Sequence, residues 1–184
     1  TLGRTVLHLH NKTSGQIFFN GKDISEINKH EFHELRKEMQ IIFQDPFSSI
    51  DPRMSVRQLI AEPLKIFKLC KSKEEIEKKV KETMDTVGLA SRLADSYAHE
   101  LDGGRRQRIG IGRAIILDPK FIVCDEPVSA LDVSIQAQIL NLMQDLQAER
   151  NLTYIFITHN LSVVKHISND IMVMYLGCAV EKAS

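Results

Sequence analysis

The sequence predicts an α/β fold in which a mostly parallel sheet is flanked by helices and a helical subdomain is inserted into the chain. Helical patterns alternate with short apolar runs over residues 103–175, which is the order of parallel strands joined by helices. Residues 52–97 carry helical patterns only. We therefore expect an N-terminal part of the core at residues 1–51, a helical subdomain at 52–100, and the rest of the core at 101–184.

Turn and capping signals locate some of the elements. Asn20-Gly21 favours the positive φ angles of a tight turn and predicts a hairpin over residues 16–24. Ser72, with a glutamate three residues later, predicts a capped helix start, and Gly88 predicts the end of that helix. Apolar periodicity predicts further helices at residues 1–10, 25–37, 103–117, 134–150 and 161–167, and strands at residues 39–43, 121–124, 153–157 and 171–175.

Composition excludes several classes of protein. The 24 basic and 24 acidic side chains balance to a net charge of zero, which gives no general attraction to nucleic acid or to an anionic membrane surface. Cys70, Cys124 and Cys178 are too widely spaced to predict a disulfide framework or a zinc site, and they fit a reducing cytosol. The longest apolar run, residues 171–180, is about half of the roughly 20 residues that span a bilayer. A connection to a membrane would therefore come through a partner.

Two adjacent carboxylates, Asp125 and Glu126, follow the strand expected at residues 121–124. Open α/β sheets bind their ligands at the carboxyl ends of strands. One carboxylate there can hold Mg²⁺, and its neighbour can orient and deprotonate a water that attacks a γ-phosphate. The alternative is a strand that ends in a solvated acidic turn, and these two residues alone do not exclude it.

His159 and Gln44 follow two other apolar strands, so we expect them at the same edge of the sheet as Glu126. His159 could hydrogen-bond a γ-phosphate, and the amide oxygen of Gln44 could contact Mg²⁺ or the attacking water. A histidine at a strand end is also common as a structural residue. The convergence of three strand ends favours a site of phosphoryl transfer.

A glycine-rich stretch from Leu101 to Arg108 begins the helix expected at residues 103–117. Gly103 and Gly104 would expose backbone N–H groups at the positive end of the helix dipole, which suits an anion. The other interpretations are a plain glycine-rich helix start and a basic patch that binds nucleic acid. The neutral charge of the chain argues against the second.

These motifs resemble the nucleotide-binding domain of ABC transporters, and the resemblance extends over residues 1–184. In order along the chain, Gln44 matches the Q-loop, Leu101 to Arg105 the signature motif, Phe121 to Glu126 the Walker B strand, Ser129 to Asp132 the D-loop and His159 the switch histidine. Within the family, residues 43–49, 130–138 and 153–162 resemble the ATPase subunits of oligopeptide and dipeptide importers.

The resemblance implies a P-loop NTPase-like fold and an ATPase that uses ATP and Mg²⁺. Asp125 and Gln44 would bind Mg²⁺, and Glu126, His159 and Gln44 would be catalytic. Two such domains would pair head to tail, as a homodimer or a heterodimer. The residues that would contact nucleotide across this dimer are Asp102, Gly103, Gly104, Arg105 and Asp132.

The implied partners are transmembrane permease subunits and, indirectly, an extracytoplasmic peptide-binding protein. Nucleic acid is not among them. The implied location is peripheral, at the cytoplasmic face of the cell membrane.

The sequence departs from the family in two places. It contains no G-x-x-x-x-G-K-[ST] phosphate loop (Walker A), and residues 15–22 only mimic one. Residues 1–4 match the helix start that follows this loop in the family, so we expect Thr1 at the nucleotide and the given sequence to be part of a longer protein. In the signature motif, Asp102 and Arg105 replace the usual Ser and Gln. An ionised Asp repels a phosphate, although it also serves well as a simple helix cap.

The leading interpretation is an ATPase subunit that powers peptide import, inactive as this polypeptide alone because the phosphate loop is absent. A second is a soluble ABC ATPase acting on DNA or ribosomes, which usually carries a coiled-coil, zinc or basic insertion that residues 52–97 lack. A third is a truncated or degenerate subunit with only an interaction role. The presence of Asp125, Glu126 and His159 argues against a protein that lost its ATPase function long ago.

Overall fold

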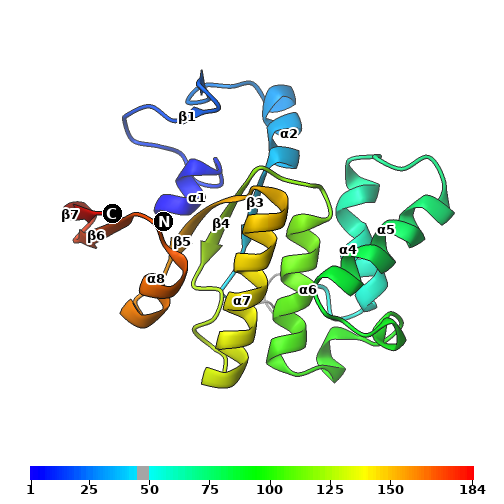
Figure 1. Ribbon diagram of the computed structural model, residues 1–184. Helices are drawn as coiled ribbons and strands as arrows, with labels where there is room; N and C mark the ends of the chain where they lie inside the picture. The colour runs from blue at the N-terminus through cyan, green and yellow to red at the C-terminus, as the bar shows by residue number, and fades with distance from the viewer. Residues whose placement is uncertain (45–49) are drawn as a thin grey trace.

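The computed structural model of the protein describes residues 1–44 and 50–184, and Figure 1 shows how its elements are arranged. The helices are α1 Leu2–Val6, α2 Lys29–Glu38, α4 Val56–Ile66, α5 Lys73–Thr86, α6 Gly103–Ile115, α7 Val133–Arg150 and α8 Leu161–Ile167, with short 3-10 turns η1 Ser91–Leu93 and η2 Ala98–Glu100. The strands are β1 Phe18–Phe19, β2 Lys22–Asp23, β3 Met39–Ile42, β4 Phe121–Asp125, β5 Thr153–Ile157, β6 Ile171–Tyr175 and β7 Cys178–Ala183.

The centre of the fold is a three-stranded parallel sheet in the order β3–β4–β5. The register places Ile42 of β3 beside Cys124 of β4, and Cys124 beside Phe156 of β5. The three strands therefore end at the same edge of the sheet. The helices on the sheet and this parallel order confirm the predicted α/β class.

Strand β4 is covered on both faces because its side chains alternate between two apolar clusters. Ile122 and Cys124 lie in the larger cluster with residues of α4, α5, α6 and α7. Phe121 and Val123 lie in a smaller cluster on the other face, with Leu7 just after α1 and other apolar residues. Ile122, Val123 and Cys124 have no exposed surface, and burying an aliphatic side chain in this way stabilises the fold by about 1.5–3 kcal/mol. The strand that leads to the acidic pair is thus buried on both faces.

The helices expected at residues 52–97 are present as α4 and α5, which pack against α6. The Ser72 side chain accepts a hydrogen bond from the Glu75 backbone N–H at 3.2 Å, as predicted, and Gly88 follows the helix with φ +68°. The Glu75 carboxylate accepts instead from the backbone N–H of Lys71, so only half of the predicted capping box forms. One continuous apolar cluster joins these helices to α6 and α7. The division at residues 51 and 100 stays a prediction.

Two expected elements differ in the structure. Helix α1 ends at Val6, because Leu7 turns inward against the sheet and His8 adopts φ +51°, so the pattern that extended to residue 10 overestimated the helix. Strand β6 pairs antiparallel with β7 and not with the parallel sheet. Periodicity identified both segments correctly as helix and strand, but it does not specify the partner of a strand.

The hairpin at Asn20-Gly21 forms as predicted. Both residues have positive φ, 49° and 75°, and they join the antiparallel strands β1 and β2.

Candidate functional site

The three ends of the parallel strands bring Gln44, Glu126 and His159 together. Glu126 lies at the centre of this group: its Oε2 accepts a hydrogen bond from Gln44 Nε2 at 2.9 Å, and its Oε1 lies 3.2 Å from His159 Nδ1. A carboxylate only accepts, so this geometry places the proton of a neutral His159 on Nδ1. Both oxygens of Glu126 are therefore held by residues from neighbouring strands.

The backbone at Glu126 helps to aim its side chain. Its φ is +50°, in the left-handed region that residues other than glycine rarely adopt, and its N–H donates to the Ile157 carbonyl at 2.9 Å. The chain thus turns sharply at the end of β4 while it stays bonded to β5. Strain of this kind is concentrated at functional sites.

Asp125 faces a cation that sequence reasoning did not identify. Arg4 Nε lies 3.6 Å from Asp125 Oδ2, with the carboxylate side chain 21% exposed. Helix α1 comes this close because residue 3 is glycine: a Cβ there would lie 2.5 Å from Val123 Cγ1 on β4. Gly3 immediately before Arg4 was the only signal in the sequence, and it could not reveal which carboxylate Arg4 would meet.

The glycine-rich helix start is capped by its own acidic residue. Asp102 Oδ1 accepts from the Arg105 backbone N–H at 2.8 Å, and Asp102 Oδ2 lies 3.1 Å from Arg105 Nη1. Asp102 is therefore the N-cap of α6, which was the simpler of its two interpretations. Gly104 packs against the start of α7, since a Cβ there would lie 2.6 Å from Ile135 Cγ2. A Cβ on Gly103 would lie 3.1 Å from Leu131 Cδ2, just before α7.

The remaining predicted site residues lie apart from the Glu126 cluster. Thr1 is the exposed N-cap of α1 and accepts from the Thr5 N–H at 3.0 Å through its carbonyl. Asp132 is the exposed N-cap residue of α7, without a capping hydrogen bond from its side chain. No hydrogen bond or ion pair among residues 1–44 and 50–184 joins Asp102 or Arg105 to that cluster. Residues 45–49, part of the stretch that resembles peptide importers, lie outside the described residues.

Two groups that support the site have shifted pKa values. Complete burial raises the pKa of the Cys124 thiol, one residue before Asp125, far above its ordinary value. Partial burial lowers the pKa of Arg108 on α6, whose guanidinium donates to the Val87 carbonyl at 2.7 Å. In both groups burial disfavours the charged form.

The described residues contain no cluster of three or more His, Cys, Asp or Glu side chains able to hold a metal ion by themselves. An Mg²⁺ ion at Asp125 would need oxygen ligands from a bound phosphate, which is how this ion usually binds beside nucleotides. The same part of the chain has no helix long and apolar enough to cross a bilayer.

Comparison with known proteins agrees with the geometry. Residues 1–129 match the family model described as ABC transporter. The chain is 52% identical over 184 residues to the oligopeptide transport ATP-binding protein OppF of Bacillus subtilis, which covers all of the chain and 60% of that protein. It is 50% identical over 183 residues to the dipeptide transport ATP-binding protein DppF of Lactococcus lactis, covering 98% of the chain and 59% of that protein.

A solved structure has the same fold. The dimeric ATP-binding cassette MJ0796, in a post-hydrolysis state bound to ADP and Pi, matches with a TM-score of 0.86 and 25% identity, covering 99% of this chain and 78% of that one. The chain spans about three-fifths of the length of the two curated relatives above. Since the family model covers well over half of its residues, the chain belongs to the ABC transporter family.

Proposed function

We propose that this chain is part of an ATP-hydrolysing subunit of an importer for oligopeptides or dipeptides. The single observation that carries the proposal is Glu126, held between Gln44 and His159 at the shared edge of a parallel sheet. A carboxylate fixed by two neighbours at the ends of strands is well placed to orient and deprotonate a water that attacks a γ-phosphate.

Each residue of the cluster has a separate role in this proposal. Glu126 is the general base, and His159 leaves Glu126 to hydrogen-bond the γ-phosphate. The amide oxygen of Gln44 would contact the Mg²⁺ ion or the water that attacks this phosphate. Asp125 and the amide oxygen of Gln44 hold Mg²⁺, which would neutralise charge on the phosphates. Arg4 keeps the carboxylate of Asp125 in place from the side of α1.

The proposal also includes a second copy or a related ATPase subunit, paired head to tail. Thr1 lies at the nucleotide of its own subunit. The residues that contact the nucleotide of the other subunit are Asp102, Gly103, Gly104, Arg105 and Asp132. The exposure of Asp102, Gly103, Arg105 and Asp132 supports this part, because residues that act on a partner's ligand must be accessible in the single chain. Gly104 is buried and has no such support.

The transported substrate is proposed from the relatives. OppF and DppF are named as oligopeptide and dipeptide transport ATP-binding proteins, and they share about half of their aligned residues with this chain. The proposed partners are transmembrane permease subunits, with a peptide-binding protein acting indirectly from outside. The subunit would lie at the cytoplasmic face of the membrane, and no nucleic acid takes part.

We further propose that the 184 residues alone neither bind ATP tightly nor hydrolyse it. No phosphate loop of the G-x-x-x-x-G-K-[ST] type is present in them, so the backbone N–H groups and the lysine that would hold the β- and γ-phosphates are lacking. A micromolar affinity for ATP, measured by titration calorimetry on this polypeptide, would contradict the proposal.

The catalytic assignment is tested in the full-length protein that carries this sequence. Glu126→Gln keeps the size of the side chain but removes the base, so ATP turnover should fall at least a hundredfold while ATP binding is retained. Glu149→Gln makes the same change of a carboxylate to an amide at an exposed position on α7, so it is the matched control and should leave turnover unchanged. Equal turnover in all three proteins would show that Glu126 is not the base.

The transport assignment needs a separate assay. Cells lacking the subunit should fail to take up radiolabelled di- to pentapeptides, and the wild-type protein should restore uptake where Glu126→Gln does not. Uptake that persists without the subunit would exclude the proposed substrate class and leave the ATPase assignment untouched.

A further inference from the structure

Gln107 on α6 is a buried polar side chain whose amide donor has no partner in the described part of the chain. Its side chain is 1% exposed, and its Nε2 atom makes no hydrogen bond to any of the residues that the structure describes. An amide that is removed from water without a partner destabilises the conformation in which this happens. The native fold therefore keeps Gln107 at a cost in stability, which calls for an explanation.

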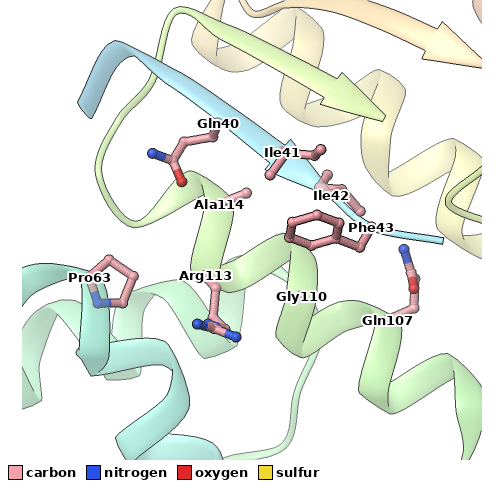
Figure 2. Close-up of a pocket in the computed structure, with 9 residues that line it drawn as sticks. All are labelled: Gln40, Ile41, Ile42, Phe43, Pro63, Gln107, Gly110, Arg113 and Ala114. Carbon is pink, nitrogen blue, oxygen red and sulfur yellow. The ribbon is translucent and has the colours of Figure 1, made fainter. Parts of the chain in front are cut away.

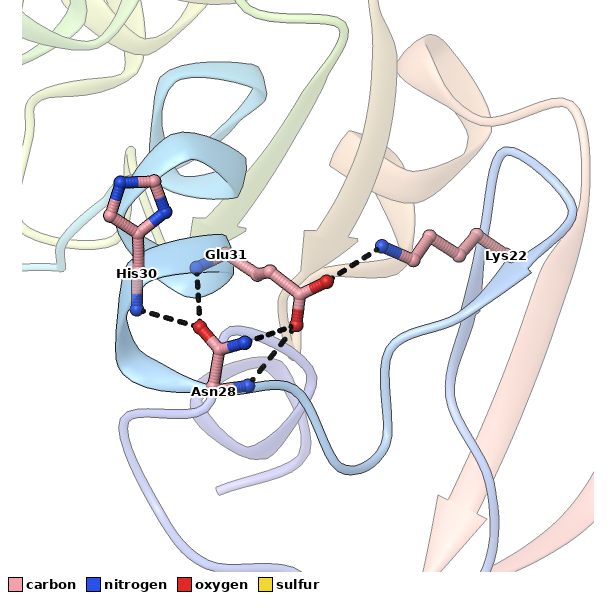
Figure 3. Close-up of polar contacts among 4 residues, drawn as sticks. All are labelled: Lys22, Asn28, His30 and Glu31. Atoms are coloured by element: carbon pink, nitrogen blue, oxygen red, sulfur yellow. Dashed lines mark hydrogen bonds and ion pairs between the residues drawn. The ribbon is translucent and has the colours of Figure 1, made fainter.

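The side chain borders a cavity of about 150 Å³ between α6 and β3. Figure 2 shows the amide nitrogen of Gln107 pointing from α6 toward the end of β3, where Phe43 lies. Gly110, one turn further along α6, lines the same cavity, and a Cβ there would meet no atom within 4 Å. The helix and the strand are thus separated by open space at this position, and an inward movement would meet no obstacle at Gly110.

The end of β3 leads directly to the catalytic cluster. Phe43 borders the cavity, and the next residue, Gln44, donates to Glu126 Oε2 at 2.9 Å. A movement of the Phe43–Gln44 segment toward α6 would therefore change the distance between Gln44 and Glu126. The cavity therefore lies between the helix that begins at Asp102 and the residue that contacts the proposed base.

We propose that Gln107 is a positioning residue that couples α6 to Gln44. In the open conformation, which is that of the structure, its amide nitrogen donates no hydrogen bond to the described residues. When α6 and β3 close on the cavity, the amide donates to a main-chain carbonyl of the Phe43–Gln44 segment, and this bond fixes Gln44 in the geometry needed for hydrolysis. The closed conformation gains a hydrogen bond that the open one lacks, so the two states form a switch that a ligand can bias.

This inference rests on the proposed function, because it assigns Gln107 to the action of Gln44. A positioning role of Gln107 can be distinguished by measurement from an unpaired buried amide that has no function. Replacing an unpaired buried amide by an apolar group of equal length stabilises the open state in either case. If the Gln107 amide forms a hydrogen bond in the closed conformation, the same replacement also lowers the rate of ATP turnover. If it forms none, turnover stays the same.

The test is Gln107→Met in the full-length protein, since methionine matches glutamine in length and lacks the amide. We expect the melting temperature to rise by a few degrees, kcat to fall at least tenfold, and the KM for ATP to change less than threefold. Gln147→Met, on α7 and away from the cavity, is the control and should change none of these quantities.

Three results would overturn the inference. A higher melting temperature with unchanged kcat would make Gln107 a structural defect only. A lower melting temperature would mean that its amide is already paired. In NMR spectra of protein labelled with ¹⁵N-glutamine, the side-chain amide signal of Gln107 is assigned as the one that disappears in Gln107→Met. If this signal does not move when a non-hydrolysable ATP analogue binds, the new hydrogen bond does not form. A wild-type protein that binds the analogue but shows no ATPase activity would instead refute the proposed function.

Discussion

Replacing Asp102 and Arg105 by the residues usual in the family should accelerate ATP hydrolysis in the full-length protein. The perturbation is the double variant Asp102→Ser with Arg105→Gln. In the proposed dimer, Asp102 faces the γ-phosphate bound by the other subunit. Serine can donate a hydrogen bond to that phosphate, whereas an ionised aspartate can only repel it.

The size of the effect follows from the electrostatics of the helix start. One added like-charge pair at 4 Å costs on the order of 4 kcal/mol at an effective dielectric constant of 20, or roughly a thousandfold in affinity. The Asp102 side chain is 57% exposed, and its Oδ2 lies 3.1 Å from the Arg105 guanidinium, so water and this cation offset most of the repulsion. We therefore expect turnover to rise at least tenfold, which corresponds to about 1.4 kcal/mol.

The assay is steady-state phosphate release over a range of ATP concentrations, which separates kcat from KM, with Asp102→Asn as a second variant. Asparagine caps a helix as well as aspartate does, so this variant removes the charge and keeps the cap. It should recover part of the gain. If both variants turn over ATP at the wild-type rate, Asp102 acts only as a cap and the electrostatic reasoning is wrong.

Three other outcomes follow from packing and burial. Gly112→Ala should raise the melting temperature by about 2–4 °C, because the methyl group would lie at an ordinary 3.5 Å from its neighbours and alanine favours the helix by about 1 kcal/mol. Gly104→Ala should lower it, since its methyl would lie 2.6 Å from another side chain; a thermal melt followed by circular dichroism measures both. At pH 8, iodoacetamide should modify the exposed Cys178 and spare Cys124, whose pKa burial raises; modification of both in the folded protein, detected by mass spectrometry, would contradict the buried position of β4.

Local signals in the sequence were sufficient for the elements whose geometry is set by neighbouring residues. Asn20-Gly21 specified its turn through backbone sterics, and Ser72 specified a helix start through one hydrogen bond. The apolar strands β3, β4 and β5 were identified because their side chains alternate between two apolar clusters, although only β4 is buried along most of its length. The end of α1 was not, because it depends on Leu7 packing against a sheet that is distant in the sequence.

The candidate site was predictable to the extent that topology determines it. Parallel strands that alternate with helices must end at one edge, so the meeting of Gln44, Glu126 and His159 followed from the order of the elements. The approach of Arg4 to Asp125 did not follow, because it requires a helix to lie within contact of a strand across Gly3. The unpaired amide of Gln107 is also a property of packing and leaves no pattern in the sequence.

The unusual features of this chain are concentrated on α6. Asp102 and Arg105, which depart from the family pattern, lie at the cap and in the first turn of this helix, and Gln107, with its buried amide, lies in the next turn. The carboxylates at the end of β4 match the family pattern. In the proposed head-to-tail pair the start of α6 would contact the nucleotide of the other subunit, and Glu126 would act on the nucleotide of its own subunit. The departures at Asp102 and Arg105 would therefore weaken the partner's site and leave this subunit's own base intact. A change at Asp102 or Arg105 should accordingly alter the nucleotide site of the partner subunit, while the capacity of Glu126 to activate water in its own site stays the same.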